Sequence, residues 1–185
     1  KEVQGVTIDT SDDTIWFVSP SDKTMYHITK TGENIGTVSL NLSSPTGIAY
    51  DSRSDTLWVL SETSLVNITK DGTTNKTITL DIADVDQIYL DTEDDAIYIT
   101  AGADYSGKNY VYKVKLTSQT YGLMYTLTDS YAIEGIYIKN GSSVRLFVKF
   151  YDKADKVLQN TSKKSCEFNN LNNTVFMRKK IEICY

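Results

Sequence analysis

Histidine, cysteine and proline are scarce in this sequence, with one, two and two residues respectively among 185. Because His27 is the only histidine, a Ser-His-Asp or Cys-His catalytic arrangement would have to use it. Cys166 and Cys184 fit either a disulfide formed in an oxidising compartment or two reduced thiols, and both readings stay open. Catalysis by a serine or a cysteine nucleophile with a histidine base therefore depends on the surroundings of His27.

Positive charge and long apolar runs are also lacking. The formal net charge is −5 and the pI is about 4.9, whereas a nucleic-acid-binding surface needs clustered lysine and arginine. The most basic stretch, MRKKIE at Met177–Glu182, is short. No apolar run approaches the roughly 20 residues that cross a bilayer. We therefore expect no nucleic-acid partner and no membrane insertion.

Linkers rich in glycine, proline or serine are missing too, which predicts a single domain over residues 1–185. No signal peptide is recognised, and the chain begins with KEVQ rather than methionine. These features suggest a processed or excised product, or part of a longer protein.

The sequence does contain one motif that is repeated four times. Each copy opens on a short β-like segment around a central anchor residue, Gly5, Gly47, Gln87 or Gly135, and the anchors recur after 42, 40 and 48 residues. The four segments are VQGVTID (Val3–Asp9), PTGIAYD (Pro45–Asp51), VDQIYLD (Val85–Asp91) and IEGIYIK (Ile133–Lys139). Eleven residues after each anchor stands Trp16, Trp58, Tyr98 or Leu146. Fixed internal offsets of this kind are the signature of a structural repeat.

Within each copy the pattern favours β-strands. Segments such as GVTID and TIWFVS are rich in β-branched and aromatic residues, and polar turns such as TSDD separate them. Four short strands in about forty residues match one blade of a β-propeller. We therefore predict an all-β propeller of four-stranded antiparallel blades, with about four blades over residues 3–42, 43–82, 83–130 and 131–185 and an irregular last blade.

These opening segments resemble those of β-propellers of the NHL and SdiA-regulated type, whose blades begin with GI/V-x-x-D and pass through an acidic turn. The resemblance covers residues 3–150 and implies the propeller fold, but such propellers include hydrolases, lyases and binding modules. This repeat type usually closes with more than four blades, so further N-terminal blades or completion by oligomerisation are both expected alternatives.

Three sets of residues that suggest chemistry are interpreted as structural. His27 occupies the place that Asn67 and Lys113 take in the next copies, which predicts a solvent-facing position. The acidic turns DTSDD, DSRSD and DTEDD suggest calcium, but side-chain capping of the turns explains them without a metal. The aromatic residues Trp16, Trp58 and Tyr98 share one register between apolar neighbours, which predicts packing between blades rather than sugar stacking.

The residues just before the anchors, Gln4, Thr46, Asp86 and Glu134, are the sharpest candidates for a site. Equivalent inner-strand positions of a propeller converge near its axis, so these side chains would form an oxygen-rich ring that could hold Ca²⁺ and activate water. The EG pair at Glu134 is similar to the metal-ligand motif of gluconolactonase-type propellers. The alternative is a polar channel lined with water and no cofactor.

A second candidate is the long connection TAGADYSGKNYVY at Thr100–Tyr112, which lengthens the third repeat. Its Gly, Asp, Asn and Tyr content is typical of adaptable contact loops. We therefore expect Tyr105, Asn109 and Tyr110 to contact a ligand.

The sequence thus favours a non-enzymatic binding module that recognises a protein or glycan receptor, as an adhesin-like part of an extracellular or phage-tail-like virion assembly. The alternative is a Ca²⁺-dependent hydrolase of the lactonase or phytase-like propeller class. A structural spacer that only connects partners is a third class.

Overall fold

The computed structural model describes residues 2–102, 108–128, 131–139, 143–150 and 164–169, with side chains for 2–102 and 108–126. Every regular element in this part of the chain is a β-strand, so the predicted all-β class is confirmed. The described residues include no helix able to cross a membrane.

The strands form four antiparallel sheets in chain order, each a meander in which consecutive strands pair. Blade 1 contains β1 (Val6–Asp9), β2 (Thr14–Ser19), β3 (Thr24–Ile28) and β4 (Asn34–Ser39). Blade 2 contains β5 (Gly47–Asp51), β6 (Thr56–Ser61), β7 (Ser64–Ile68) and β8 (Thr74–Thr79). Blade 3 contains β9 (Val85–Asp91), β10 (Ala96–Ala101), β11 (Lys108–Lys115) and β12 (Thr120–Thr128). Blade 4 has three described strands, β13 (Tyr131–Lys139), β14 (Ser143–Phe150) and β15 (Lys164–Asn169).

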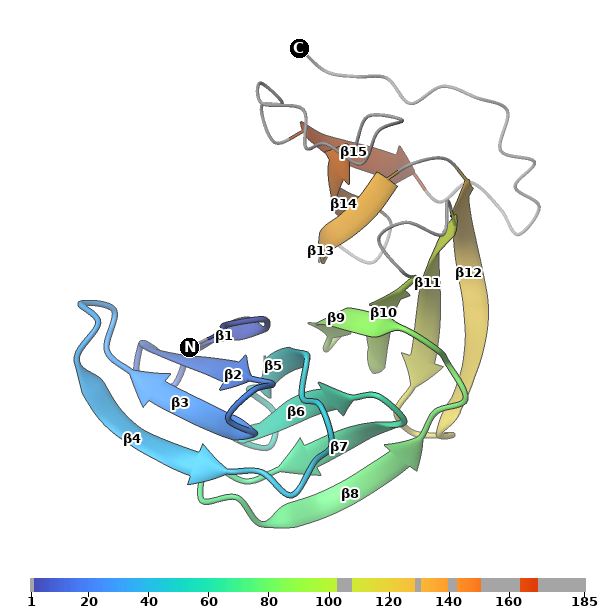
Figure 1. The fold of residues 1–185 in the computed structure, drawn as a ribbon. Coiled ribbons are helices and arrows are strands. Elements are labelled where there is room, and N and C mark those ends of the chain that lie inside the picture. Colours follow the sequence, from blue (N-terminus) through green and yellow to red (C-terminus); the bar gives the residue numbers. More distant parts are fainter. Residues whose placement is uncertain (1, 103–107, 129–130, 140–142, 151–163, 170–185) are drawn as a thin grey trace.

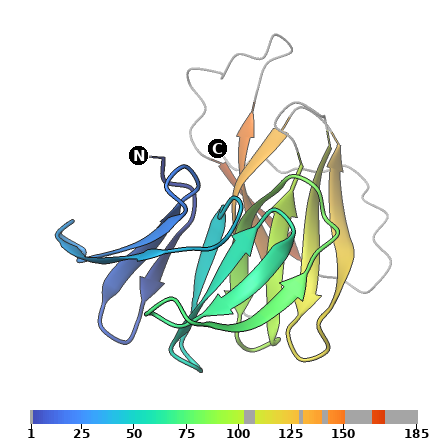
Figure 2. The ribbon, with the colours of Figure 1, turned by 60° about the horizontal axis from the view of Figure 1, so that its bottom comes forward.

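The blades follow one another around a common axis (Figure 1). The first strand of each blade, β1, β5, β9 or β13, lies on the inside, and each of these inner strands contacts the next. Figure 2 shows the blades fanning out from this inner row. The architecture is therefore that of a partial β-propeller.

Glycines at the anchor positions let the inner strands approach closely. A Cβ atom added at Gly5 would lie 2.8 Å from the backbone nitrogen of Ile48 and 2.9 Å from the Cα of Gly47. A Cβ added at Gly47 would lie 3.1 Å from the backbone nitrogen of Ile88 in the following blade. The repeated glycine is thus required by backbone contact between neighbouring blades.

The core lies between the blades. One cluster joins Trp16, Val18 and Met25 of blade 1 to Leu57 and Val59 of blade 2. A second, larger cluster lies between blades 2 and 3 and contains Trp58. The exposed fractions of Trp16, Trp58 and Tyr98 are 3%, 4% and 4%. The prediction that these aromatics are buried is confirmed, and Trp16 and Trp58 pack between blades.

The acidic turns follow one local pattern. The first aspartate of each turn is buried, and its Oδ1 accepts a hydrogen bond from the backbone N–H two residues later, in the order Asp9 from Ser11, Asp51 from Arg53 and Asp91 from Glu93. The last aspartate of each turn has a positive φ, 62° at Asp13, 53° at Asp55 and 46° at Asp95. Aspartate suits both places because it bonds its own turn and tolerates the left-handed region. The turns are therefore capped as the sequence predicted.

The predicted solvent-facing position of His27 is wrong. Its ring stacks on that of Trp16, with centroids 4.1 Å apart, and its side chain is 14% exposed. Asn67, which takes the same place in blade 2, is buried and donates a hydrogen bond to Thr56. His27 is only partly exposed because the flat face of the Trp16 ring lies against its imidazole.

Candidate functional site

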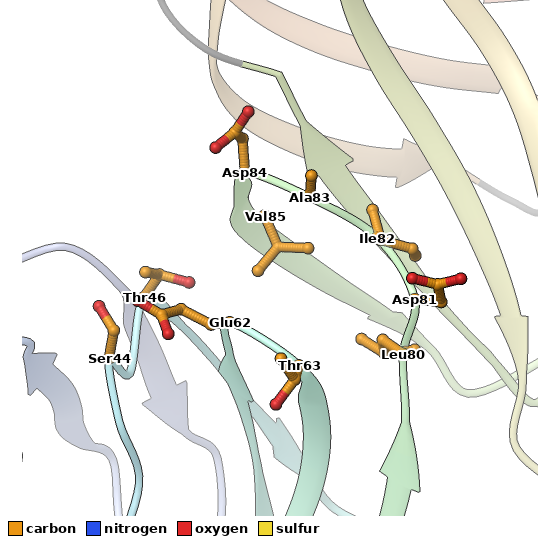
Figure 3. A pocket seen from close by; sticks show the side chains of 10 residues that line it. All are labelled: Ser44, Thr46, Glu62, Thr63, Leu80, Asp81, Ile82, Ala83, Asp84 and Val85. Carbon is orange, nitrogen blue, oxygen red and sulfur yellow. The ribbon is translucent and has the colours of Figure 1, made fainter.

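A pocket of about 510 Å³ opens between blades 2 and 3, at the end of the molecule where the inner strands begin. It is formed by the β4–β5 connection, the β6–β7 turn and the β8–β9 connection (Figure 3). The residues that line it are Ser44, Thr46, Glu62, Thr63, Leu80, Asp81, Ile82, Ala83, Asp84 and Val85.

The described lining of this pocket is acidic. Glu62, Asp81 and Asp84 contribute three exposed carboxylates, and no lysine or arginine is among the residues described as lining it. Like charges that converge on one hollow raise the local concentration of cations and repel anions. The pocket is therefore suited to a positively charged or strongly hydrogen-bond-donating ligand.

Short backbone contacts hold the walls of this pocket in place. The N–H of Leu80 donates to the carbonyl of Thr63 at 2.8 Å, and the N–H of Gly102 donates to the carbonyl of Asp84 at 2.9 Å. The backbone N–H of Asp81 donates to the hydroxyl of Tyr121 at 2.8 Å. These bonds hold the β8–β9 connection against the β6–β7 turn and against blade 3. The backbone that carries the pocket carboxylates is therefore fixed in position.

Thr46 adds a hydroxyl with unused bonding capacity. Its backbone N–H donates to the carbonyl of Leu60 at 2.9 Å, but its buried Oγ1 has no hydrogen-bond partner among the described residues. A buried hydroxyl without a partner is unfavourable, so a ligand or water that bonds it would be stabilised there.

Two of the four predicted ring residues, Gln4 and Asp86, contact the side chain of the anchor residue Gln87. Gln87 reaches across the axis, and its side-chain nitrogen donates to the carbonyl of Gln4 at 3.1 Å although 83 residues separate them. The same nitrogen lies 3.4 Å from Oδ1 of Asp86. The side chain of Gln87 therefore contacts both the backbone of Gln4 in blade 1 and the side chain of Asp86 in its own blade.

A calcium ion at that ring stays a prediction. Gln4 contributes its backbone carbonyl to the contact with Gln87, and Thr46 lines the pocket between blades 2 and 3. The side chain of Glu134 lies outside the described residues. Among the described side chains, no group of three or more histidine, cysteine, aspartate or glutamate residues is arranged to hold a metal.

The residues of the predicted contact loop fall in different places. Tyr105 lies outside the described residues, and Asn109 is a buried residue of β11 with an exposed fraction of 3%. Tyr110 is half-buried and packs against the core between blades 2 and 3, with its ring 6.3 Å from that of Tyr112. The described part of Thr100–Tyr112 therefore belongs mostly to strands β10 and β11.

His27 lies in the sheet of blade 1 and is bonded to structural groups. Its Nε2 is 2.7 Å from the hydroxyl of Thr14, and 3.8 Å from a carboxylate oxygen of Asp12. Because Trp16 covers one side of the ring, these contacts fix the imidazole against the sheet.

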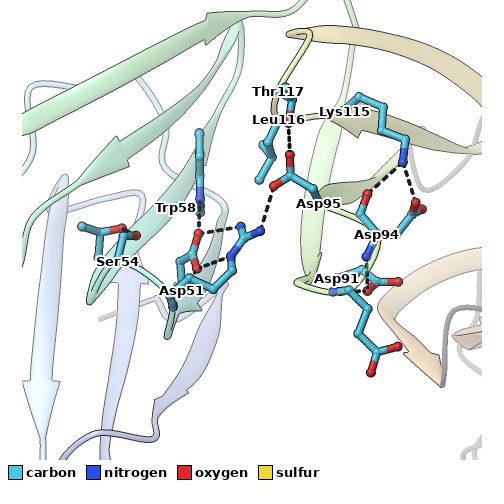
Figure 4. Close-up of polar contacts among 12 residues, drawn as sticks. Asp51, Ser54, Trp58, Asp91, Asp94, Asp95, Lys115, Leu116 and Thr117 are labelled. Carbon is cyan, nitrogen blue, oxygen red and sulfur yellow. Dashed lines mark hydrogen bonds and ion pairs between the residues drawn. The ribbon is translucent and has the colours of Figure 1, made fainter.

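The acidic turns form a second polar region, at the opposite end of the blades. Lys70 of blade 2 lies 2.7 Å from Oδ2 of Asp9 in blade 1 and 2.5 Å from Oδ1 of Asp55 in its own blade. Arg53 of blade 2 contacts Asp51 at 2.9 Å and Asp95 of blade 3 at 2.8 Å (Figure 4). We call the contacts Lys70–Asp9 and Arg53–Asp95, which join neighbouring blades, the interblade ion pairs.

Lys70 and Arg53, the cations of the interblade ion pairs, lower the pKa of the buried aspartates that they contact. Burial alone would raise the pKa of Asp9, but hydrogen bonds from Lys70 and Ser11 outweigh it and lower that pKa to about 2. Burial opposes the lowering in Asp51 as well, and hydrogen bonds from Arg53 overcome it to lower the pKa of Asp51. The carboxylates of Asp9 and Asp51 are thus paired within the fold and contribute to its stability.

Sequence reasoning missed the pocket because its carboxylates come from segments outside the aligned motifs. Glu62 lies in the β6–β7 turn, and Asp81 and Asp84 lie in the connection LDIAD before β9. The available signal was the cluster of acidic residues in connections that lead to inner strands. Only Thr46 belongs to both the predicted ring and the pocket.

Comparison with known proteins supports the fold. No protein-family model matches the chain, and the curated proteins give no significant match. Among solved structures, a nidogen/laminin complex matches with a TM-score of 0.68 at 15% identity, over 90% of this chain and 60% of that chain. Hydrazine synthase from Kuenenia stuttgartiensis matches with a TM-score of 0.66 at 8% identity, over 92% of this chain and 51% of that chain. Virginiamycin B lyase from Staphylococcus aureus matches with a TM-score of 0.59 at 17% identity, over 90% of this chain and 55% of that chain.

These structures are β-propeller-type proteins with four-stranded antiparallel sheets. This chain spans about half to three-fifths of the length of each. They therefore establish a partial β-propeller, and their different activities leave the function to be argued from the site.

Proposed function

We propose that this chain is a binding module, and that the pocket between blades 2 and 3 receives a basic side chain of a protein partner. The observation that carries the proposal is that Glu62, Asp81 and Asp84 all line one pocket of about 510 Å³. A lysine or arginine side chain would place its charge among the carboxylates and its methylene stem against Leu80 and Ile82.

The lining favours a protein partner over a glycan. Sugar-binding surfaces commonly offer an aromatic face, but none of the described lining residues is aromatic. The aromatics Trp16, Trp58 and Tyr98 are buried and are not available for stacking. A protein partner is also consistent with the nidogen/laminin complex among the similar folds, which is a likeness of fold alone.

The wider setting is part of the same proposal. From sequence features we also propose that the chain belongs to an extracellular or virion assembly and that the Thr100–Tyr112 connection contacts the partner. The same features place it near the NHL and SdiA-regulated propellers in this proposal. The support for that family is the GI/V-x-x-D opening of the repeats, seen at Gly5–Asp9 and Gly47–Asp51.

The test measures binding of two fluorescent hexapeptides, one rich in lysine and arginine and one of serine and glycine, to the full chain. We expect the basic peptide alone to bind, with affinity that falls as salt rises. The double variant Glu62→Gln, Asp84→Asn should weaken that binding at least fivefold. A matched control, Glu33→Gln with Asp71→Asn, removes the same charge from exposed turns outside the pocket and should change binding less than twofold.

Two results would contradict the proposal. Equal loss of affinity in the control would show that net charge, rather than the pocket, attracts the peptide. Binding to an immobilised glycan that survives Glu62→Gln with Asp84→Asn would indicate a carbohydrate-binding module with its site elsewhere.

A further inference from the structure

One broad face of blade 1 is apolar and uncovered within the described structure. Val6 and Ile8 on β1 are 63% and 51% exposed. Ile15, Phe17, Tyr26 and Ile28 continue this face across β2 and β3 and are only half-buried. We call these six residues the open face.

In the next two blades the equivalent residues are covered. The counterpart of Val6 is Ile48 in blade 2, with an exposed fraction of 3%, and Ile88 in blade 3, with 9%. The counterparts of Ile15 and Phe17 in blade 2 are Leu57 and Val59, which are fully buried. Those residues are covered by the preceding blade, so the open face has the composition of a blade interface without its second half.

Charge at the edge of the open face repeats the same pattern. Lys70 of blade 2 pairs with Asp55 of its own turn and also with Asp9 of the preceding blade. Lys30 takes the place of Lys70 in blade 1, and pairs with Asp13 of its own turn. Its second partner would be an acidic residue at the end of the inner strand of a blade packed on the open face.

We propose that the open face is an interface for a further β-blade of this repeat type, with an acidic residue where Asp9 and Asp51 stand. Such a blade would present an aromatic and aliphatic face, as blade 1 presents Trp16 and Val18 to blade 2. The proposal is independent of the pocket between blades 2 and 3.

A second copy of this chain fits the face less well. A second copy packed head to tail would place its blade 4 on the open face, and that repeat carries Lys139 where the earlier repeats carry aspartate. Lys139 opposite Lys30 would place like charges across the interface. The complementary occupant is therefore a blade of the repeat that retains the aspartate.

The experiment adds such a blade to the full chain. A second copy of residues 3–44 is inserted before Val3, which reproduces the 42-residue step from Gly5 to Gly47. A separate insert of residues 43–84 provides an independent blade. The reporter is the thiol introduced by Val6→Cys in the original blade 1, with Cys166→Ser and Cys184→Ser, and its alkylation rate is measured.

We expect either insert to slow alkylation at least tenfold, because the further blade covers position 6. A control thiol introduced by Glu33→Cys, on an exposed turn, should react at the same rate with and without the insert. Changing the aspartate of the insert to lysine, Asp9→Lys or Asp51→Lys, should return at least part of the lost rate.

Unchanged alkylation with both inserts would overturn the proposal. If the chain without an insert forms dimers in sedimentation, and alkylation at position 6 slows as its concentration rises, the occupant is a second copy and the proposal is wrong. If the lysine variants protect as well as the aspartate inserts, the acidic requirement is refuted.

Discussion

Lys70 is the residue whose removal best tests the interblade ion pairs. Its ammonium lies 2.7 Å from the buried Asp9 carboxylate, so Lys70→Met would leave that charge buried with fewer partners. We expect a loss of roughly 2–4 kcal/mol in the free energy of unfolding at pH 7, measured by urea denaturation. The matched control is Lys30→Met, because Lys30 and Asp13 are 48% and 75% exposed and should contribute less than about 0.5 kcal/mol.

The effect of Lys70→Met should depend on pH with a definite sign. The pKa of Asp9 is lowered from 3.8 to about 2, so its ionised form stabilises the fold above pH 3.8, and this contribution is lost as pH falls toward 2. The stability difference between wild type and Lys70→Met should therefore shrink over that range. A difference that stays constant from pH 7 to pH 2.5 would show that Lys70 acts through packing.

Trp58 tests the core between blades 2 and 3. It is 4% exposed and its indole N–H donates to Asp51 at 3.3 Å. Trp58→Ala should cost roughly 3–5 kcal/mol by chemical denaturation, since it leaves a cavity and removes that bond. Leu123→Ala, at a side chain that is 53% exposed, should cost less than about 1 kcal/mol. A similar small loss at Trp58 would contradict its role as core.

At single positions, sequence reasoning succeeded where the repeat constrained the residue. Trp16, Trp58 and Tyr98 were predicted as core because the register and apolar neighbours recur. The solvent-facing position predicted for His27 is wrong because a polar residue at that repeat position need not be exposed. The stacked ring of Trp16 covers the imidazole. The pocket carboxylates could not be predicted, because they line one pocket only when two blades pack side by side.

Among the elements, the inner strands β1 and β5 depend on glycine at their contact. Gly5→Ala would place a Cβ 2.8 Å from the Ile48 nitrogen, and backbone cannot move away as a side chain can. We expect a loss of about 1–3 kcal/mol in unfolding free energy. Gly36→Ala on β4 is the control: its Cβ meets nothing within 4 Å, so stability should be unchanged or rise by up to about 1 kcal/mol. Equal losses would indicate a general cost of replacing strand glycines.

Strands and their pairing were largely predictable, because alternating side chains recur in the copies and acidic turns recur in the first three. The structure bears out antiparallel meanders of four strands in blades 1, 2 and 3. The register shifts between Ile99 and Ala101 in blade 3, and between Ile133 and Gly135 in blade 4, were not predicted. Such bulges depend on how each sheet twists against its neighbours, which one strand's sequence does not encode.

For the molecule as a whole, calcium binding at the ring of Gln4, Thr46, Asp86 and Glu134 is a prediction of the hydrolase alternative. Bound Ca²⁺ would raise the thermal midpoint by mass action, and Asp86→Asn or Glu134→Gln would remove that rise. We expect melting curves recorded with calcium and with chelator to coincide, because the proposed function is binding without a metal. A calcium-dependent rise that is lost in both variants would instead support the hydrolase.

Blade packing was predictable, but the complete ring was not. Each blade presents one face to the blade before it and one to the blade after it, so stability accumulates through nearest-neighbour contacts. The number of blades that closes the circle depends on the angle between neighbours, which small changes at each interface alter. The sequence therefore predicts the blade better than the ring.

The interblade ion pairs also impose an order on biosynthesis. Asp9 leaves the ribosome with blade 1, but Lys70 follows only when the third strand of blade 2 has been made. Asp51 pairs with Arg53 of its own turn at once, whereas Arg53 must wait for Asp95. Blade 1 is thus linked through its acidic turn only after blade 2 has been made, and blade 2 is linked forward only after Asp95 of blade 3 has been made.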